Sequence, residues 1–256
     1  MSPLGDGLVL LGAAFAAGGV NAIAGGGSLI TFPTLVWLGR EPIRANATNT
    51  VSLSPGSLAA LLALRHDLAG LGGWIAWGSV PSVVGGAVGA LLLLRTPPPL
   101  FARLVPWLII FATAVFAFSG RTARAASVDH GGRGRVVHPA HPGALLYQLA
   151  VSVYGGYFGA GIGIMMLAGL GLAGLTAIHG MLALRNFYAM CINAVAALYF
   201  AARGAVDWRD AAVLTAGQVA GGFAGARLAR RLPPPAVRTV VVAIGAAMAV
   251  SLLLRG

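Results

Sequence analysis

Hydrophobic residues fill eight long runs of this chain, and shorter polar, glycine-containing or proline-containing stretches separate them. The runs lie at about residues 8–38, 46–65, 73–94, 100–119, 143–173, 178–202, 210–227 and 236–254. Most of them have the length of roughly 20 residues that an α-helix needs to cross a bilayer. The pattern therefore predicts an all-α, polytopic integral membrane protein with about eight hydrophobic segments.

An internal duplication groups these segments into two homologous four-segment repeats. Residues 81–99 and 217–235 align without a gap at an offset of 136, and ten of the nineteen aligned positions are identical. The identical positions include Gly85/Gly221, Gly86/Gly222, Gly89/Gly225, Arg95/Arg231 and the triple prolines at 97–99 and 233–235. Glycines at this spacing are typical of closely packed membrane helices. We expect a first membrane repeat over residues 1–119, a basic flexible linker over 120–142 and a second membrane repeat over 143–256.

The first segment of each repeat is too long for one straight span, and glycines interrupt it. A helix over residues 8–38 would be roughly 46 Å long, whereas the hydrocarbon core is roughly 30 Å thick. The interruptions are Gly25-Gly26-Gly27-Ser28 in the first repeat and Gly159, Gly161 and Gly163 in the second. Irregular backbone at membrane depth must be buried in protein or line a cavity. Paired breaks of this kind indicate a transporter with a binding site between its repeats.

Composition agrees with a membrane location and limits the partners and the chemistry. Hydrophobic residues make up 58% of the chain and charged residues 9%, whereas about a quarter of the residues of soluble domains are charged. The formal net charge of +11 comes from seventeen arginines, most of which flank hydrophobic runs as headgroup anchors, so we expect a lipid bilayer and no nucleic acid as partner. The six acids lie at segment ends or in loops. No metal or catalytic constellation results, so we expect no enzyme and no cofactor.

Polar residues open the helix that follows each break. The first repeat has Asn46, Thr48, Asn49 and Thr50 at this place, and at an offset of 135 to 136 Thr50 aligns with Arg185 or Asn186 of the second. Arg185 lies well inside an apolar run, and ions at membrane depth are functional by default. The alternative is an Arg185 side chain that extends to the membrane interface.

The chemistry of these features favours a small anion as substrate. A half-helix N-terminus presents free N–H groups and a partial positive charge, and glycine lets a ligand approach the backbone. The alternative role of these glycines is close packing or a hinge. The predicted substrate-binding residues are Gly25, Gly26, Gly27, Ser28, Asn46, Thr48, Asn49, Thr50, Gly159, Gly161, Gly163, Arg185, Asn186 and Asn193.

Several of these motifs together resemble a known family. The run from Asn21 to Pro33, Leu38-Gly39, Ala47-Thr48-Asn49, Leu184-Arg185-Asn186, Asp207-Trp208 and Gly221-Gly222 are similar to the TauE/SafE family of sulfite exporters and related permeases. The resemblance covers nearly the whole chain. It implies a permease of the prokaryotic cytoplasmic membrane for sulfite, sulfonates or related organosulfur anions, coupled to a proton or sodium gradient. Many relatives have Gly-Thr-Ser where this chain has Ala47-Thr48-Asn49, so the substrate stays open.

We therefore predict a small-anion permease that works by alternating access between its two repeats. Re-entrant first segments leave three crossings in each repeat and make the repeats inverted, which we expect; four full crossings would make them parallel. The alternatives to transport are a passive anion channel and a non-transporting membrane protein. The direction of transport, the coupling ion, the membrane orientation and the oligomeric state do not follow from the sequence.

Overall fold

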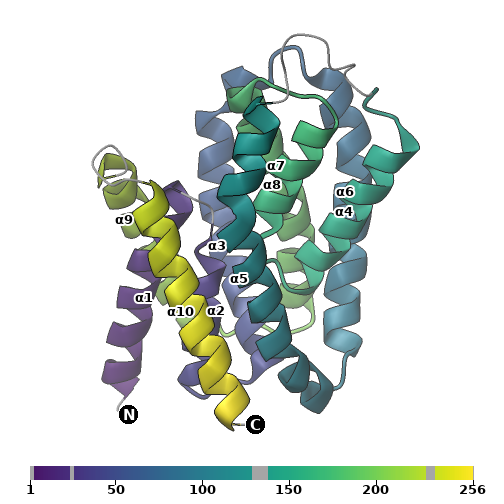
Figure 1. The fold of residues 1–256 in the computed structure, drawn as a ribbon. Helices are drawn as coiled ribbons and strands as arrows, with labels where there is room; N and C mark the ends of the chain where they lie inside the picture. The colour runs from purple at the N-terminus through teal and green to yellow at the C-terminus, as the bar shows by residue number, and fades with distance from the viewer. Residues whose placement is uncertain (1–2, 24–25, 129–137, 229–233, 256) are drawn as a thin grey trace.

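The computed structural model describes residues 3–23, 26–128, 138–228 and 234–255, and these form helices without a β-strand (Figure 1). The prediction of an all-α protein is confirmed. The helices are α1 (Pro3–Ile23), α2 (Ser28–Trp37), α3 (Pro42–Ala63), α4 (Gly72–Arg95), α5 (Pro98–Val128), α6 (Pro142–Tyr157), α7 (Ile162–Leu172), α8 (Ile178–Ala202), α9 (Trp208–Leu228) and α10 (Pro234–Arg255), with a 3-10 helix, η1, at Arg65–Leu68.

Three helices among the described residues are long and apolar enough to cross a membrane. They are α4, the Pro98–Phe118 part of α5, and α8. Shorter apolar helices lie at Gly5–Asn21, Ser28–Trp37, Ile162–Leu172 and Val242–Ser251. The eight hydrophobic runs correspond to ten α-helices because the first run of each half forms two helices.

Both predicted helix breaks are present, and at each the chain folds back. In the second half, Tyr154 Oη donates to the Ala160 carbonyl across the break, and Tyr147 Oη, two turns earlier in α6, donates to the Met165 carbonyl, each at 2.8 Å. These contacts make α6 and α7 an antiparallel hairpin. The turn requires glycine, because Gly159 and Gly161 adopt φ values of +80° and +82° that other residues rarely tolerate.

The first half contains the equivalent hairpin of α1 and α2. Near its turn, Asn21 Oδ1 accepts a hydrogen bond from the Gly27 amide at 2.9 Å. At its open end, Arg40 lies 3.7 Å from Asp6, in the first turn of α1. Each interrupted segment therefore ends close to where it began.

The two halves exchange their first helices. α1 packs along α9 of the other half, and α6 packs in the same way along α4. The remaining contacts follow the same symmetry, because α3 packs on its equivalent α8 and α5 on its equivalent α10. α1 begins and α10 ends at the same end of the bundle (Figure 1).

Glycines of the duplicated motif permit this exchange. A Cβ at Gly89 would overlap the backbone of Val153 in α6, and one at Gly221 would overlap the backbone of Phe15 in α1. A Cβ at Gly85 would lie 2.5 Å from the Ser152 side chain. The prediction that these glycines serve helix packing is confirmed, and the helix they face belongs to the other half.

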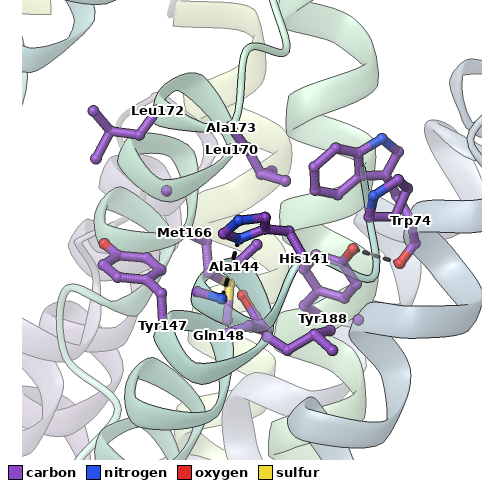
Figure 2. Close-up of a pocket in the computed structure, with 15 residues that line it drawn as sticks. Trp74, His141, Ala144, Tyr147, Gln148, Met166, Leu170, Leu172, Ala173 and Tyr188 are labelled. Atoms are coloured by element: carbon purple, nitrogen blue, oxygen red, sulfur yellow. Dashed lines mark hydrogen bonds between the residues drawn. The ribbon is translucent and has the colours of Figure 1, made fainter. Parts of the chain in front are cut away.

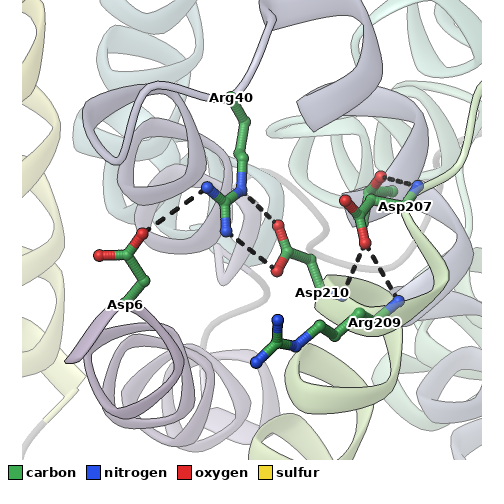
Figure 3. Close-up of polar contacts among 6 residues, drawn as sticks. Asp6, Arg40, Asp207, Arg209 and Asp210 are labelled. Atoms are coloured by element: carbon green, nitrogen blue, oxygen red, sulfur yellow. Dashed lines mark hydrogen bonds and ion pairs between the residues drawn. The ribbon is translucent and has the colours of Figure 1, made fainter. Parts of the chain in front are cut away.

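Polar contacts join the halves at the end of the bundle where α1 begins. Arg40 Nε donates to Asp210 Oδ2 at 2.6 Å and Arg40 Nη2 donates to Asp210 Oδ1 at 3.3 Å (Figure 3). The hydrogen bond to Asp210 raises the pKa of Arg40, so the guanidinium stays charged. Nearby, Asp207 Oδ1 accepts from the amides of Arg209 and Asp210 and so caps α9.

The predicted linker is partly helical. α5 continues to Val128, so residues 120–128 extend a helix instead of starting a linker. This stretch contains three alanines and two arginines, which are good helix formers. Residues 129–137 of the predicted linker lie outside the described residues.

A methyl group at the exchanged contact is expected to destabilise the protein. Gly221→Ala should lower the free energy of unfolding by about 1–3 kcal/mol, because α1 and α9 must separate to admit the new atom. The measurement is thermal unfolding of detergent-purified protein. Gly12→Ala is the control on the exposed side of α1, because its added Cβ meets no atom within 4 Å. Equal melting temperatures for the two variants would contradict the proposed packing role.

The Arg40–Asp210 pair is expected to stabilise the contact between halves by about 1–3 kcal/mol, the range of hydrogen bonds to charged groups. Asp210→Asn and Arg40→Gln should each lower the melting temperature, and the double variant should be little worse than either. A double-mutant cycle measures this coupling. Arg209→Gln removes a neighbouring exposed charge and should have no effect; strictly additive effects of the first two substitutions would show that the pair is not coupled.

Candidate functional site

A cavity of about 430 Å³ lies where the turns of both hairpins meet the middle of α3 and α8. The cavity lies midway along the bundle, because the lining residues between 49 and 57 and between 185 and 193 lie near the centres of α3 and α8. α9 closes a further side. The polar residues of the lining are Asn21, Ser28, Asn49, Thr50, Ser52, Ser57, Arg185, Asn186, Asn193 and Gln218.

Equivalent positions of the two halves line this cavity. At the offset of 136, the lining pairs are Asn49/Arg185, Thr50/Asn186, Leu53/Ala189 and Ser57/Asn193. The last pair is in direct contact, with Asn193 Nδ2 donating to Ser57 Oγ at 3.4 Å. The cavity therefore lies between equivalent surfaces of the repeats, and the equivalent of Arg185 is Asn49 rather than Thr50.

Arg185 brings a positive charge to the cavity. Its guanidinium packs against Gly163 in the first turn of α7, so closely that a Cβ at Gly163 would overlap it. The Nε atom is buried and has no hydrogen-bond partner among the described residues. The Arg185 side chain packs closely on Gly163 while its Nε donor is unused within the described protein, so this donor is free to bind a ligand.

Asn49 takes the corresponding place in the first half. It is buried, and Thr31 Oγ1 of α2 lies 2.6 Å from its Oδ1, which accepts the hydroxyl proton. The hydrogen bond from Thr31 fixes the orientation of the Asn49 amide, whose NH₂ is the group that can donate to a ligand. Thr31 thus has an orienting role that the sequence analysis did not identify.

Other polar residues of the lining were also missing from the predicted set. Gln218 Nε2 donates to Ser52 Oγ at 3.1 Å, which joins α9 to α3 beside the cavity. Gln218 follows the first glycine of the duplicated motif and aligns with Ser82 of the first repeat. A polar residue at both positions of the repeat could have marked Gln218 as a candidate for the site. Asn21 belongs to the motif that carried the family resemblance.

The structure places nine of the fourteen predicted residues in the lining and four elsewhere. Gly25 lies outside the described residues. Gly26 packs against Phe116, and Gly27 against Ala17 and Asn21. The remaining two contact the other half: Asn46 Nδ2 donates to the Tyr157 carbonyl at 2.8 Å, and Thr48 Oγ1 accepts from the Asp207 amide at 2.9 Å. The nine in the lining are Ser28, Asn49, Thr50, Gly159, Gly161, Gly163, Arg185, Asn186 and Asn193.

A second cavity, of about 290 Å³, lies beside the start of α6 (Figure 2). Its walls are mostly apolar and aromatic, and its Tyr188 Oη donates to the Trp74 carbonyl at 2.7 Å. At the offset of 136, Trp74 corresponds to Asp210, so this cavity occupies the place that the Arg40–Asp210 pair takes at the other end. It contains no arginine. The central cavity is therefore the stronger candidate for binding a charged ligand.

The central cavity offers a ligand hydrogen-bond donors and one positive charge. No cluster of three or more histidine, cysteine or acidic side chains occurs in the part of the chain that the structure describes. Hydroxyl, amide and guanidinium groups of this kind bind the oxygen atoms of a small anion.

Comparison with known proteins identifies the family of the chain. The family described as "Sulfite exporter TauE/SafE" matches residues 10–252. The chain is 30% identical over 247 residues to a "Probable membrane transporter protein" of Haemophilus influenzae, covering 91% of this chain and 89% of the relative. It is also 30% identical over 256 residues to the "Probable membrane transporter protein YfcA" of Escherichia coli K12, with coverage of 96% and 88%. No solved structure matches the chain.

A third relative, the "Probable membrane transporter protein ORF9" of Sinorhizobium, is 30% identical over 248 residues and spans 94% of this chain and 90% of its own length. The matches therefore extend across both halves and both hairpins. The apolar helices, the duplicated architecture and these full-length similarities show that the chain belongs to the TauE/SafE family of membrane transporters.

Proposed function

We propose that the protein is a permease that carries sulfite, sulfonates or related small organosulfur anions through the central cavity by alternating access between two inverted repeats. The observation that carries this proposal is Arg185, whose buried Nε has no partner among the described residues and whose side chain lines the cavity. A guanidinium donates directed hydrogen bonds to oxyanions and supplies the opposite charge.

The contacts of the helices support inverted repeats. α3 runs antiparallel to its equivalent α8, because Arg44 at the start of α3 donates to the Gly204 carbonyl just after α8, at 3.3 Å. Each hairpin returns to the end where it began, so the proposal takes α3 as a third crossing of the first half beside α4 and α5. Its support is the packing of α3 along α8, which is long and apolar enough to cross. An odd number of crossings places the second half in the opposite direction to the first.

The same arrangement supports alternating access. Each hairpin packs on a helix of the other half, so rocking of one unit against the other changes which end of the cavity is open. Because the family resemblance implies it, the proposal includes coupling of transport to a proton or sodium gradient. The described lining contains no Asp, Glu or His, so a carboxylate proton relay has no candidate within it.

A binding screen tests the substrate class. Sulfite, thiosulfate, sulfonates and carboxylates are added to purified protein, and the ligand that binds the folded state raises its melting temperature. At a ligand concentration about 100 times the Kd, the stabilisation is about 2.7 kcal/mol. Stabilisation by carboxylates alone would show that the organosulfur assignment is wrong.

Removal of the cavity charge is expected to weaken binding. Arg185→Gln should raise the Kd for the best-binding anion of the screen by about 10- to 100-fold, because a charge-assisted hydrogen bond is lost. The fold should be retained, since Nε donates no hydrogen bond within the described protein. Arg103→Gln, at an exposed position on α5, is the charge-matched control. An unchanged Kd in the Arg185→Gln variant would show that Arg185 does not bind the anion.

The position of the guanidinium is expected to matter as much as its charge. Gly163→Ala places a methyl group in the volume of the Arg185 side chain and should displace it, because a Cβ there overlaps the guanidinium. The expected result is an anion affinity roughly tenfold lower, the cost of one hydrogen bond to a charged group. Titration calorimetry of both this variant and Gly12→Ala provides the comparison. Wild-type affinity in a folded Gly163→Ala protein would contradict this positioning role.

A further inference from the structure

The central cavity carries one formal charge, and nothing in its described lining balances it. Arg185 is the charged residue of the lining, and the other residues are neutral. The acidic residues closest in sequence to the lining residues lie at one end of the bundle and have hydrogen-bond partners there. Asp210 binds Arg40, and Glu41 accepts from the amides of Ile43 and Arg44.

This charge has a different environment at each stage of an alternating-access cycle. While the cavity is open to one side, water solvates the guanidinium. During the passage to the other side the cavity is closed at both ends, and an empty cavity then holds an uncompensated cation at membrane depth. Such a cation is strongly unfavourable. A bound anion with a single negative charge makes the closed cavity neutral.

We propose that the cavity crosses between its two open states with one singly charged anion bound to Arg185, so that the protein works as an electroneutral anion exchanger. This inference rests on the proposed function, and in it the counter-transported anion replaces the proton or sodium ion as the coupled solute. The empty cavity must return to its first side with the charge exposed to low dielectric, which makes the return slow. A second anion from the other side removes that barrier, and one anion is exchanged for another.

The requirement for a neutral closed cavity also discriminates between ligands that share the same anionic group but differ in net charge. A dianion leaves one excess negative charge in the closed cavity. A zwitterion brings an ammonium group for which the described lining holds no carboxylate. Apolar walls that include Leu53, Phe158 and Val219 can receive a short carbon chain instead.

Three sulfonates with fixed charges test this inference in proteoliposomes. They are methanesulfonate, ethane-1,2-disulfonate and taurine, which carry one negative charge, two negative charges and no net charge. Labelled methanesulfonate is added outside, and each sulfonate in turn, or none, is placed inside. Methanesulfonate inside should accelerate uptake by about tenfold or more over empty vesicles. The other two should neither accelerate uptake nor be taken up, and a potassium diffusion potential of either sign should not change the exchange rate.

Each contrary outcome is distinct. Equal uptake into empty and loaded vesicles would overturn exchange, and a rate that follows the imposed potential would overturn electroneutrality. Exchange of the disulfonate at a comparable rate would overturn charge selection. If methanesulfonate neither raises the melting temperature nor enters the vesicles, while another anion of the binding screen does both, repetition of the experiment with that anion decides for or against exchange. Absence of binding and uptake for every anion of the screen would contradict the proposed function itself.

Discussion

A backbone that turns back within the depth of a bilayer must be enclosed by protein, because lipid offers no partner for its amides and carbonyls. This constraint governs the whole arrangement. α2 packs on α3 and α7 packs on α8, and each hairpin packs on a helix of the other half. Gly26 and Gly161, at the described parts of the two turns, lie against α5. Enclosing two turns from opposite halves in one place leaves polar groups facing each other, and the central cavity is the space between them.

The duplication gives these two sets of groups the same positions but different chemistry. Asn49 and Arg185 occupy equivalent places, each beside the re-entrant helix of its own half. One presents a neutral amide oriented by Thr31, and the other presents a cation seated on Gly163. A symmetric framework therefore holds an asymmetric pair of donors, which is suited to an anion that has one charged end.

The sequence was sufficient for the features that depend on local pattern. The lengths of the hydrophobic runs and the glycines at 25–27 and 159–163 predict the helices and their breaks, and the repeat offset relates the polar cluster at 46–50 to Arg185 and Asn186. Contacts between distant segments do not follow from local pattern. Gly221 predicts a close neighbour but not that the neighbour is α1. For the same reason, Asn46 and Thr48 resemble cavity residues in sequence, whereas their partners are Tyr157 and the Asp207 amide.

The exchange of first helices also has a consequence for biosynthesis. α1 emerges from the ribosome first, whereas α9, the helix against which its backbone packs around Phe15 and Gly18, is among the last to be made. The first hairpin therefore gains its partner helix only after α9 has been made. Neither half contains the helix on which its own first helix packs, so the native fold forms only when both halves are present.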